Sequence, residues 1–135
     1  MTTQDIRWQQ RFQNFEKSFS YLEHAIDIED PEIVQRAGLI QFFEMTFELA
    51  WKTLKDYLES QGFLDVNSPR TVLKKAFEIG LIGDGHQWLQ CLQDRNLTSH
   101  TYNEEIASEI ETTIRQTYYP LLHQLHRTFK EMANE

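Results

Sequence analysis

The chain has 135 residues, of which 40% are hydrophobic and 13% aromatic, a composition that fits one folded domain spanning residues 1–135 and excludes a disordered chain. Its net charge of -8 argues against non-specific binding to a nucleic-acid duplex, which needs a basic stripe to displace counterions. The same charge still allows a site that binds one or two phosphates locally.

The single cysteine, Cys91, excludes an internal disulfide and suits a reducing compartment. We interpret it as a small buried apolar residue on a helix. The N-terminal residues lack the basic and apolar segments of a signal peptide, and no apolar run approaches the length of a membrane span. We therefore expect a cytoplasmic protein with no membrane partner.

Two long helices are predicted in the first half of the chain. The first runs from Ile6 to about Ile28, because large apolar residues recur there at alternating spacings of four and three. Those residues are Trp8, Phe12, Phe15, Phe19, Leu22 and Ile26. For the second helix, Asp30 is the predicted N-cap with Pro31 at the first helical position, and Gly62 is the left-handed residue that ends it. Its apolar residues cover much of the circumference, so it should be central in the fold.

Glu44 and Glu48 are four residues apart on this second helix, beside its apolar stripe. Such a like-charge pair does not stabilise a helix. Two interpretations remain open. The pair is either partly exposed surface or a contact with a partner or a second copy of the chain.

Three further helices are predicted after residue 67. Ser68 and Pro69 begin the third, which ends at Gly80, and the fourth runs from about residue 86 to residue 97 and carries Arg95 near its end. Pro120 should kink the last helix or split it in two. No segment shows strand alternation, so the sequence predicts an all-α antiparallel bundle of about five helices.

The segment from Arg95 to Tyr102 differs from the rest, because it gathers a fixed cation, an amide, an imidazole and a phenol. On one continuous helix Arg95 and His100 would lie roughly 140° apart around the axis, so the helix must end between them if both are to face one ligand. Thr101 and Glu104 match a capping box, which predicts Thr101 as the N-cap of the last helix and Tyr102 in its first turn. A helix N-terminus at this place favours a phosphate.

These residue types suit RNA cleavage without a metal. A histidine such as His100 can move protons near neutral pH, Arg95 can hold the charge that builds on the phosphate, and Asn96 can orient either of them. A single imidazole cannot easily act as acid and base in one step. This mechanism therefore predicts a homodimer with the motif at its interface.

A metal site is the competing hypothesis, because His123 and His126 lie three apart on the last helix. No third histidine or carboxylate joins them on that face. We favour a surface pair near a helix C-terminus, where cations suit the helix dipole. We therefore expect no metal and no cofactor.

The pattern Arg95-Asn96-x-x-x-His100-x-Tyr102 resembles the signature of HEPN-domain proteins. More closely, it resembles the subfamily called nucleotidyltransferase substrate-binding proteins, which are partners of minimal nucleotidyltransferases. The similarity extends to residues 43–58, to Ser68-Pro69-Arg70 and to Tyr118-x-Pro120, and so covers most of the chain.

The resemblance implies a helical homodimer whose active sites form where two motifs meet. It further implies a ribonuclease toxin of a two-gene toxin–antitoxin pair, with the minimal nucleotidyltransferase as antitoxin that AMPylates Tyr102. A phosphate added there, beside Arg95, would occupy the anion site and exclude RNA. The alternative is a non-catalytic subunit that presents substrate or nucleotide to the transferase, and a third interpretation is a helical scaffold with an inert motif.

Overall fold

The computed structural model describes residues 6–100 and 102–135, and within these ranges it contains helices and no strand. The elements are α1 (Arg7–Ile26), α2 (Ile33–Ser60), α3 (Pro69–Glu78), α4 (Gly85–Arg95), the 3-10 turn η1 (Thr98–His100), α5 (Glu104–Thr113), the π-helical segment η2 (Ile114–Tyr118) and α6 (Tyr119–Ala133). The predicted all-α bundle is therefore confirmed. The predicted dimer remains a prediction.

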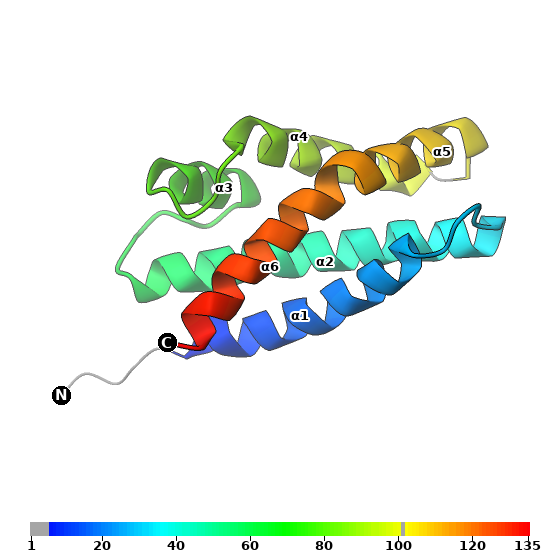
Figure 1. The fold of residues 1–135 in the computed structure, drawn as a ribbon. Helices are drawn as coiled ribbons and strands as arrows, with labels where there is room; N and C mark the ends of the chain where they lie inside the picture. The colour runs from blue at the N-terminus through cyan, green and yellow to red at the C-terminus, as the bar shows by residue number, and fades with distance from the viewer. Residues whose placement is uncertain (1–5, 101) are drawn as a thin grey trace.

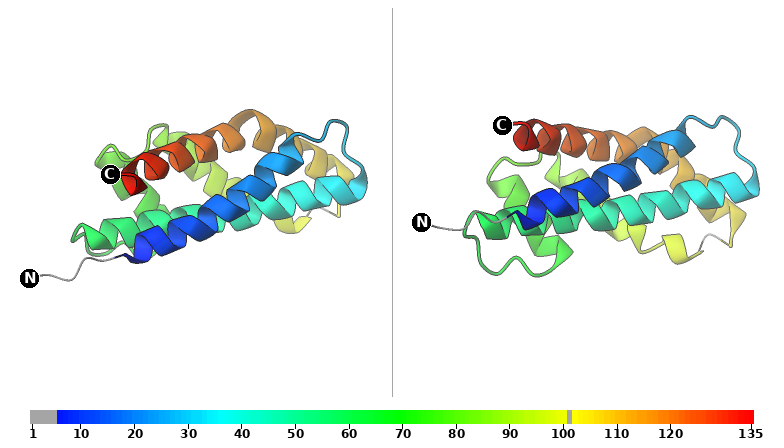
Figure 2. Two further views of the ribbon diagram at one scale, coloured as in Figure 1. Left: turned by 60° about the horizontal axis from the view of Figure 1, so that its bottom comes forward. Right: turned by 90° about the horizontal axis from the view of Figure 1, so that it is seen from below.

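The long helices α1 and α2 form an antiparallel hairpin, and the shorter helices α3, α4 and α5 lie above α2 in a second layer (Figure 1). Helix α6 crosses the hairpin and returns the chain to the end where α1 begins, as two further views show (Figure 2). In the described part of the chain, no helix is both long enough and apolar enough to cross a membrane.

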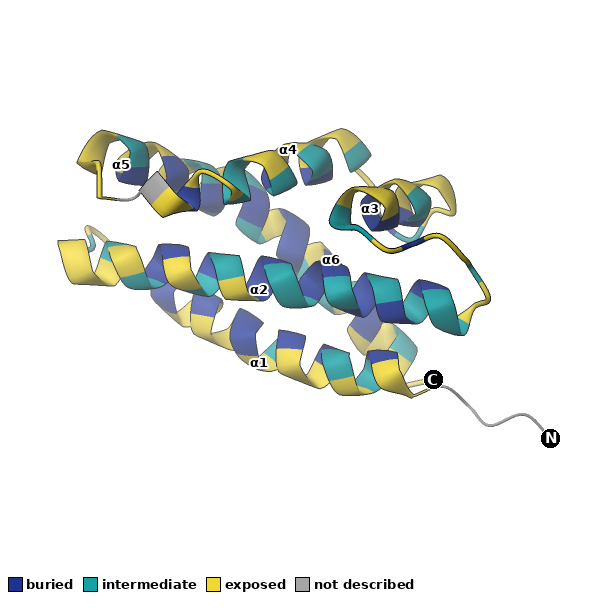
Figure 3. Cartoon of the chain, turned by 180° about the vertical axis from the view of Figure 1, so that it is seen from behind, coloured by how far each residue is buried: buried dark blue, intermediate teal, exposed yellow. Residues whose placement is uncertain are grey.

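Helix α2 is central, as its wide apolar surface predicted, because it contacts α1, α3, α5 and α6. Its buried residues alternate with partly exposed ones along its length (Figure 3). The largest side chains with almost no exposed surface form an aromatic core: Phe15, Phe43, Phe47, Trp88 and Phe129. Each fully buried apolar side chain of this size contributes about 1.5–3 kcal/mol to stability before the entropy of ordering is counted.

The start of α2 differs from the prediction, because Glu32 and not Asp30 is its N-cap. Glu32 forms a reciprocal capping box with Gln35, whose side chain accepts the Glu32 N–H at 2.9 Å. Asp30 instead adopts a left-handed conformation with φ of 48°, which aspartate tolerates better than most residues. The turn between α1 and α2 uses Asp30, so the cap moves two residues along the chain.

The other predicted boundaries are close to those observed. Gly62 and Gly80 follow α2 and α3 with φ of 89° and 79°, the left-handed geometry that glycine adopts without steric cost. Ser68 caps α3 by accepting the Thr71 N–H. Helix α4 ends at Arg95 itself.

Pro120 does split the last helix. It lies in the first turn of α6, directly after the π-helical segment η2. Proline has no N–H to donate and its ring clashes with the preceding turn, so a wider turn lets the chain continue with a bend. The bend buries Tyr118, whose ring stacks on Phe43 at a centroid distance of 5.7 Å.

A bridge of ion pairs ties the second half of the chain to the α1–α2 hairpin. Glu111 accepts hydrogen bonds from Nε of Arg36 and Nε of Arg115, both at 2.8 Å. Arg115 also donates to the carbonyl oxygens of Ile26 at 2.7 Å and Ile28 at 2.9 Å. Burial by itself would raise the pKa of Glu111, but the two guanidinium groups outweigh it and lower that pKa.

Replacing Glu111 with glutamine should therefore reduce the free energy of unfolding by about 2 kcal/mol at neutral pH, since two half-buried arginines lose their shared anion. A carboxyl whose pKa is lowered by folding stabilises the fold above its unfolded pKa, about 4.3. The advantage of the wild type over E111Q should thus disappear as the pH falls below that value. Urea unfolding of both proteins between pH 7 and pH 3 measures it, and a constant difference would contradict it.

Candidate functional site

Arg95 is the last residue of α4, and its guanidinium is held by a carboxylate from the central helix. Nη2 of Arg95 donates to Oε2 of Glu48 at 2.6 Å, and the two side chains are 34% and 32% exposed. Charge-assisted hydrogen bonds of this kind are shorter and stronger than neutral ones. Nε of Arg95 is buried and has no hydrogen-bond partner in the described part of the chain. The guanidinium is thus fixed on one side and still reaches solvent.

A second carboxylate one turn earlier on α2 holds the segment that follows. The buried hydroxyl of Thr98 donates to Oε1 of Glu44 and lies 2.6 Å from the carbonyl oxygen of Arg95. Thr98 begins the η1 turn that ends at His100. Glu44 and Glu48, four residues apart on α2, thus bind Thr98 and Arg95, which are three residues apart on the facing segment.

Glu44 and Glu48 are therefore half-buried contacts within the chain. The interpretation of partial exposure is correct but incomplete, because it missed that both carboxylates bind the Arg95 segment. The signal available in the sequence was the matching spacing of one helical turn in each segment.

Nζ of Lys52 also approaches Glu48, at 3.8 Å from Oε1, and its side chain is 39% exposed. The Glu48 carboxylate therefore has a guanidinium on one oxygen and an ammonium near the other. The sequence prediction of the site did not include Lys52.

Helix α4 ends at Arg95 and so does not continue to His100, as the sequence predicted. Asn96 is the exposed C-cap residue of α4, and His100 ends η1. The side chain of His100 and all of Thr101 lie outside the description, so the approach of the imidazole to Arg95 stays a prediction. Tyr102 is 83% exposed.

The predicted capping box of Thr101 and Glu104 is wrong. Helix α5 begins at Glu104, and Asn103 is its N-cap, with Oδ1 accepting the N–H groups of Glu105 at 2.9 Å and Ile106 at 3.3 Å. Asparagine is at least as good a cap as threonine, and it lies next to the first helical residue. Tyr102 consequently precedes the helix and is not in its first turn.

A part-buried hydrogen bond from η2 also holds the end of α4. The hydroxyl of Tyr118 in η2 donates to Oδ2 of Asp94, the residue before Arg95. Burial raises the pKa of Tyr118 well above its usual range, and the Asp94 carboxylate raises it further. The phenol therefore keeps its proton and remains a donor, so the π-helical bend and the Arg95 segment are joined.

The two histidines of the metal hypothesis lie away from this site. Nε2 of His126 is 2.8 Å from Oε2 of Glu16 on α1, and its ring stacks on Phe19 at 5.0 Å. Residues 6–100 and 102–135 contain no group of three or more His, Cys, Asp or Glu side chains that could hold a metal ion. His126 therefore serves as a bridge between α6 and α1.

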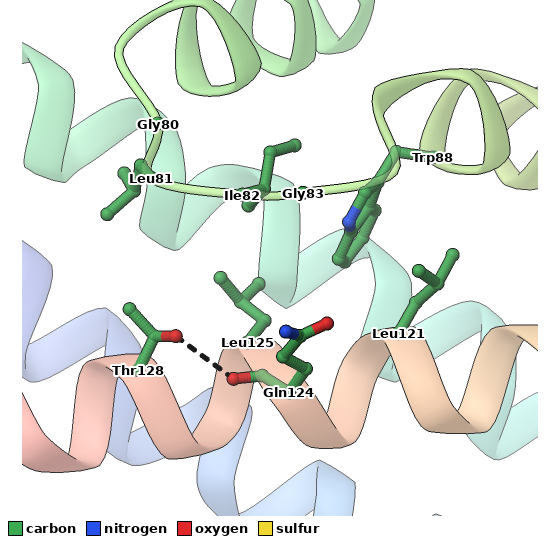
Figure 4. Close-up of a pocket in the computed structure, with 9 residues that line it drawn as sticks. All are labelled: Gly80, Leu81, Ile82, Gly83, Trp88, Leu121, Gln124, Leu125 and Thr128. Carbon is green, nitrogen blue, oxygen red and sulfur yellow. Dashed lines mark hydrogen bonds between the residues drawn. The ribbon is translucent and has the colours of Figure 1, made fainter.

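A separate cavity of about 260 Å³ lies between the loop at residues 80–83 and α6, with Trp88 and Leu125 among its walls (Figure 4). The residues that line it carry no ionisable group. General acid–base chemistry needs such groups, so this cavity is not the place where a reaction of that kind would occur.

Comparison with known proteins shows the family of the chain. Residues 10–131 match the family model described as nucleotidyltransferase substrate binding protein like. A curated relative, named probable ribonuclease HepT, of Haemophilus influenzae is 36% identical over 91 residues, and the match covers 62% of this chain and 62% of that relative's length.

Two solved structures are similar over most of their length. One, from Thermus thermophilus, is 39% identical with a TM-score of 0.76 and covers 82% of this chain and 94% of its own. The other, from Haemophilus influenzae, is described as revealing the fold of a substrate binding domain of a nucleotidyltransferase. It is 28% identical, has a TM-score of 0.76, and covers 88% of this chain and 98% of its own. The chain is thus a HEPN-type protein and belongs to the nucleotidyltransferase substrate binding protein-like family.

Proposed function

We propose that the protein is a metal-independent endoribonuclease, the toxin of a toxin–antitoxin pair. The observation that carries the proposal is the half-buried guanidinium of Arg95, held by Glu48 at the end of α4 and followed within five residues by His100. Arg95 binds the scissile phosphate, His100 transfers protons, and the exposed Asn96 orients the phosphate or the imidazole. The relative named probable ribonuclease supports this assignment.

The reaction needs no oxidant and no cofactor. The 2′-oxygen of the RNA attacks the adjacent phosphorus, a base takes its proton, and the bond to the 5′-oxygen breaks as that oxygen gains a proton. Negative charge builds on the phosphorane in between, where fixed donors such as those of Arg95 stabilise it most. Because one imidazole cannot serve both proton transfers at once, two copies of the chain supply the two histidines as a homodimer.

A minimal nucleotidyltransferase is the proposed partner and antitoxin, in keeping with the family to which the chain belongs. It adenylates Tyr102, whose side chain is 83% exposed and lies in the short connection between η1 and α5. The added phosphate carries negative charge and competes with RNA for Arg95.

The second candidate is a non-catalytic subunit that binds substrate or nucleotide for the transferase. The description of the Haemophilus influenzae structure as a substrate binding domain favours it. Both candidates use Arg95 as an anion site, and only the first requires His100 to transfer protons.

Arg95→Ala and His100→Ala should each reduce cleavage of single-stranded RNA by about a hundredfold or more, because each removes one part of the transition-state stabilisation. Arg127→Ala is the matched control, since Arg127 is an exposed arginine on α6 far along the chain from the motif. Cleavage should persist in excess EDTA. Full activity of H100A would refute the role of His100, and loss of activity in EDTA would refute the metal-independent mechanism. If the wild type does not cleave RNA and the transferase depends on this chain, the second candidate would replace the nuclease.

Co-expression with the cognate nucleotidyltransferase should add one adenylate-sized mass increment on Tyr102. Tyr102→Phe should abolish the increment, whereas Tyr21→Phe should not, although Tyr21 is also an exposed tyrosine at 43%. Intact-mass and peptide mass spectrometry provide the measurement. An unmodified wild-type chain beside an active transferase would speak against this regulation.

A further inference from the structure

The Glu48 carboxylate joins two cations that come from different parts of the chain. Arg95 of α4 is 2.6 Å from Oε2, and Lys52 of α2 is 3.8 Å from Oε1. These three charges sum to +1, in a chain whose net charge is -8. The neighbouring carboxylates of Glu44 and Asp94 accept hydrogen bonds from Thr98 and Tyr118, so Glu48 is the carboxylate that Arg95 and Lys52 share.

The two cations are held to different degrees. The contact of Arg95 is a short charge-assisted hydrogen bond, whereas a 3.8 Å pair with a 39% exposed lysine is weak in water. Lysine carries a compact charge on a flexible stem and binds phosphate as a point charge. Lys52 can therefore leave Glu48 and follow an anion while Arg95 stays in place.

We propose that Lys52 is a second phosphate-binding residue. A strand of RNA that places its scissile phosphate on Arg95 puts a neighbouring phosphate on Lys52. The Glu48 carboxylate lies between the two cations and keeps them separate. The inference rests on the proposed function and adds to it the direction of the bound strand, which runs along α2. The contact is to the phosphate backbone, so it does not depend on the sequence of the RNA.

An ordinary helix pair is the simpler account of Lys52 and Glu48, and the same helix offers its control. Lys55 pairs with Glu59 at 3.2 Å, again four residues apart, and its side chain is 28% exposed. Lys55 lines a different cavity, together with Arg11 and Asp56, on the side of α2 that faces α1. Lys52 and Lys55 therefore share helix, charge and type of pairing, but only Lys52 shares a carboxylate with Arg95.

The test measures binding of the full-length protein to a fluorescent single-stranded RNA with 2′-O-methyl groups, which lacks the attacking hydroxyl. Lys52→Gln should weaken binding roughly fivefold at low salt and reduce the slope of log affinity against log salt by about 0.7. Lys52→Arg should keep both, because it keeps the charge. Lys55→Gln should behave as wild type, and all variants should unfold at the same temperature if Lys52 has no larger structural role.

The outcomes separate the two proposals. Equal binding by K52Q and K55Q would overturn the role of Lys52 and leave the nuclease standing if the wild type cleaves ordinary RNA. Binding without cleavage by the wild type would refute the nuclease, and the comparison of K52Q with K55Q would still decide the second phosphate contact. A wild-type chain that does not bind RNA at all would overturn both.

Discussion

The contact between Arg95 and Glu48 is the interaction on which the candidate site depends. A guanidinium at the end of a helix loses much of its order if it has only solvent around it, because its long side chain has many rotamers. Glu48 removes that freedom with a hydrogen bond of 2.6 Å from the central helix. Glu44 does the same for the following turn through Thr98, so one face of α2 holds the motif segment at Arg95 and at Thr98.

Helix α2 can hold the motif segment because one of its faces packs in the core and the next face carries two carboxylates. One side supplies the aromatic core with Phe43 and Phe47, and close packing there leaves its backbone little freedom to shift. The adjacent face carries the carboxylates Glu44 and Glu48. Tyr118 connects the two, since its ring stacks on Phe43 while its hydroxyl binds Asp94 beside Arg95. A substitution of Phe43 in the core should therefore change the position of the Arg95 guanidinium.

Much of the fold could be predicted from the sequence, because apolar periodicity and glycine or proline signals act locally. As expected, helices end at Gly62 and Gly80, one helix begins after Ser68, and the last helix bends at Pro120. The two wrong caps have a common cause. Several residues close together were able to cap, and the choice between Asp30 and Glu32, or between Thr101 and Asn103, depends on how the chain turns before the helix.

The site was only partly predictable for a different reason. Arg95 was found because its neighbours form a recognisable pattern along the chain. Glu44, Glu48 and Lys52 lie more than forty residues away in sequence, and their contact with the pattern depends on how α4 and η1 pack on α2. A like-charge pair that does not stabilise its own helix was the sign of such a contact, but it did not name the partner.

The position of Arg115 has a consequence for the order in which parts of the protein unfold. Its guanidinium holds the carbonyl groups of Ile26 and Ile28, where α1 ends, from a segment almost ninety residues further along the chain. Local unfolding of the connection between α1 and α2 thus requires the hydrogen bonds from Arg115 in η2 to break. We therefore expect both regions to belong to one cooperative unit. The amide hydrogens of the two regions should accordingly be protected together, because fraying of the hairpin at that end would break the hydrogen bonds of Arg115.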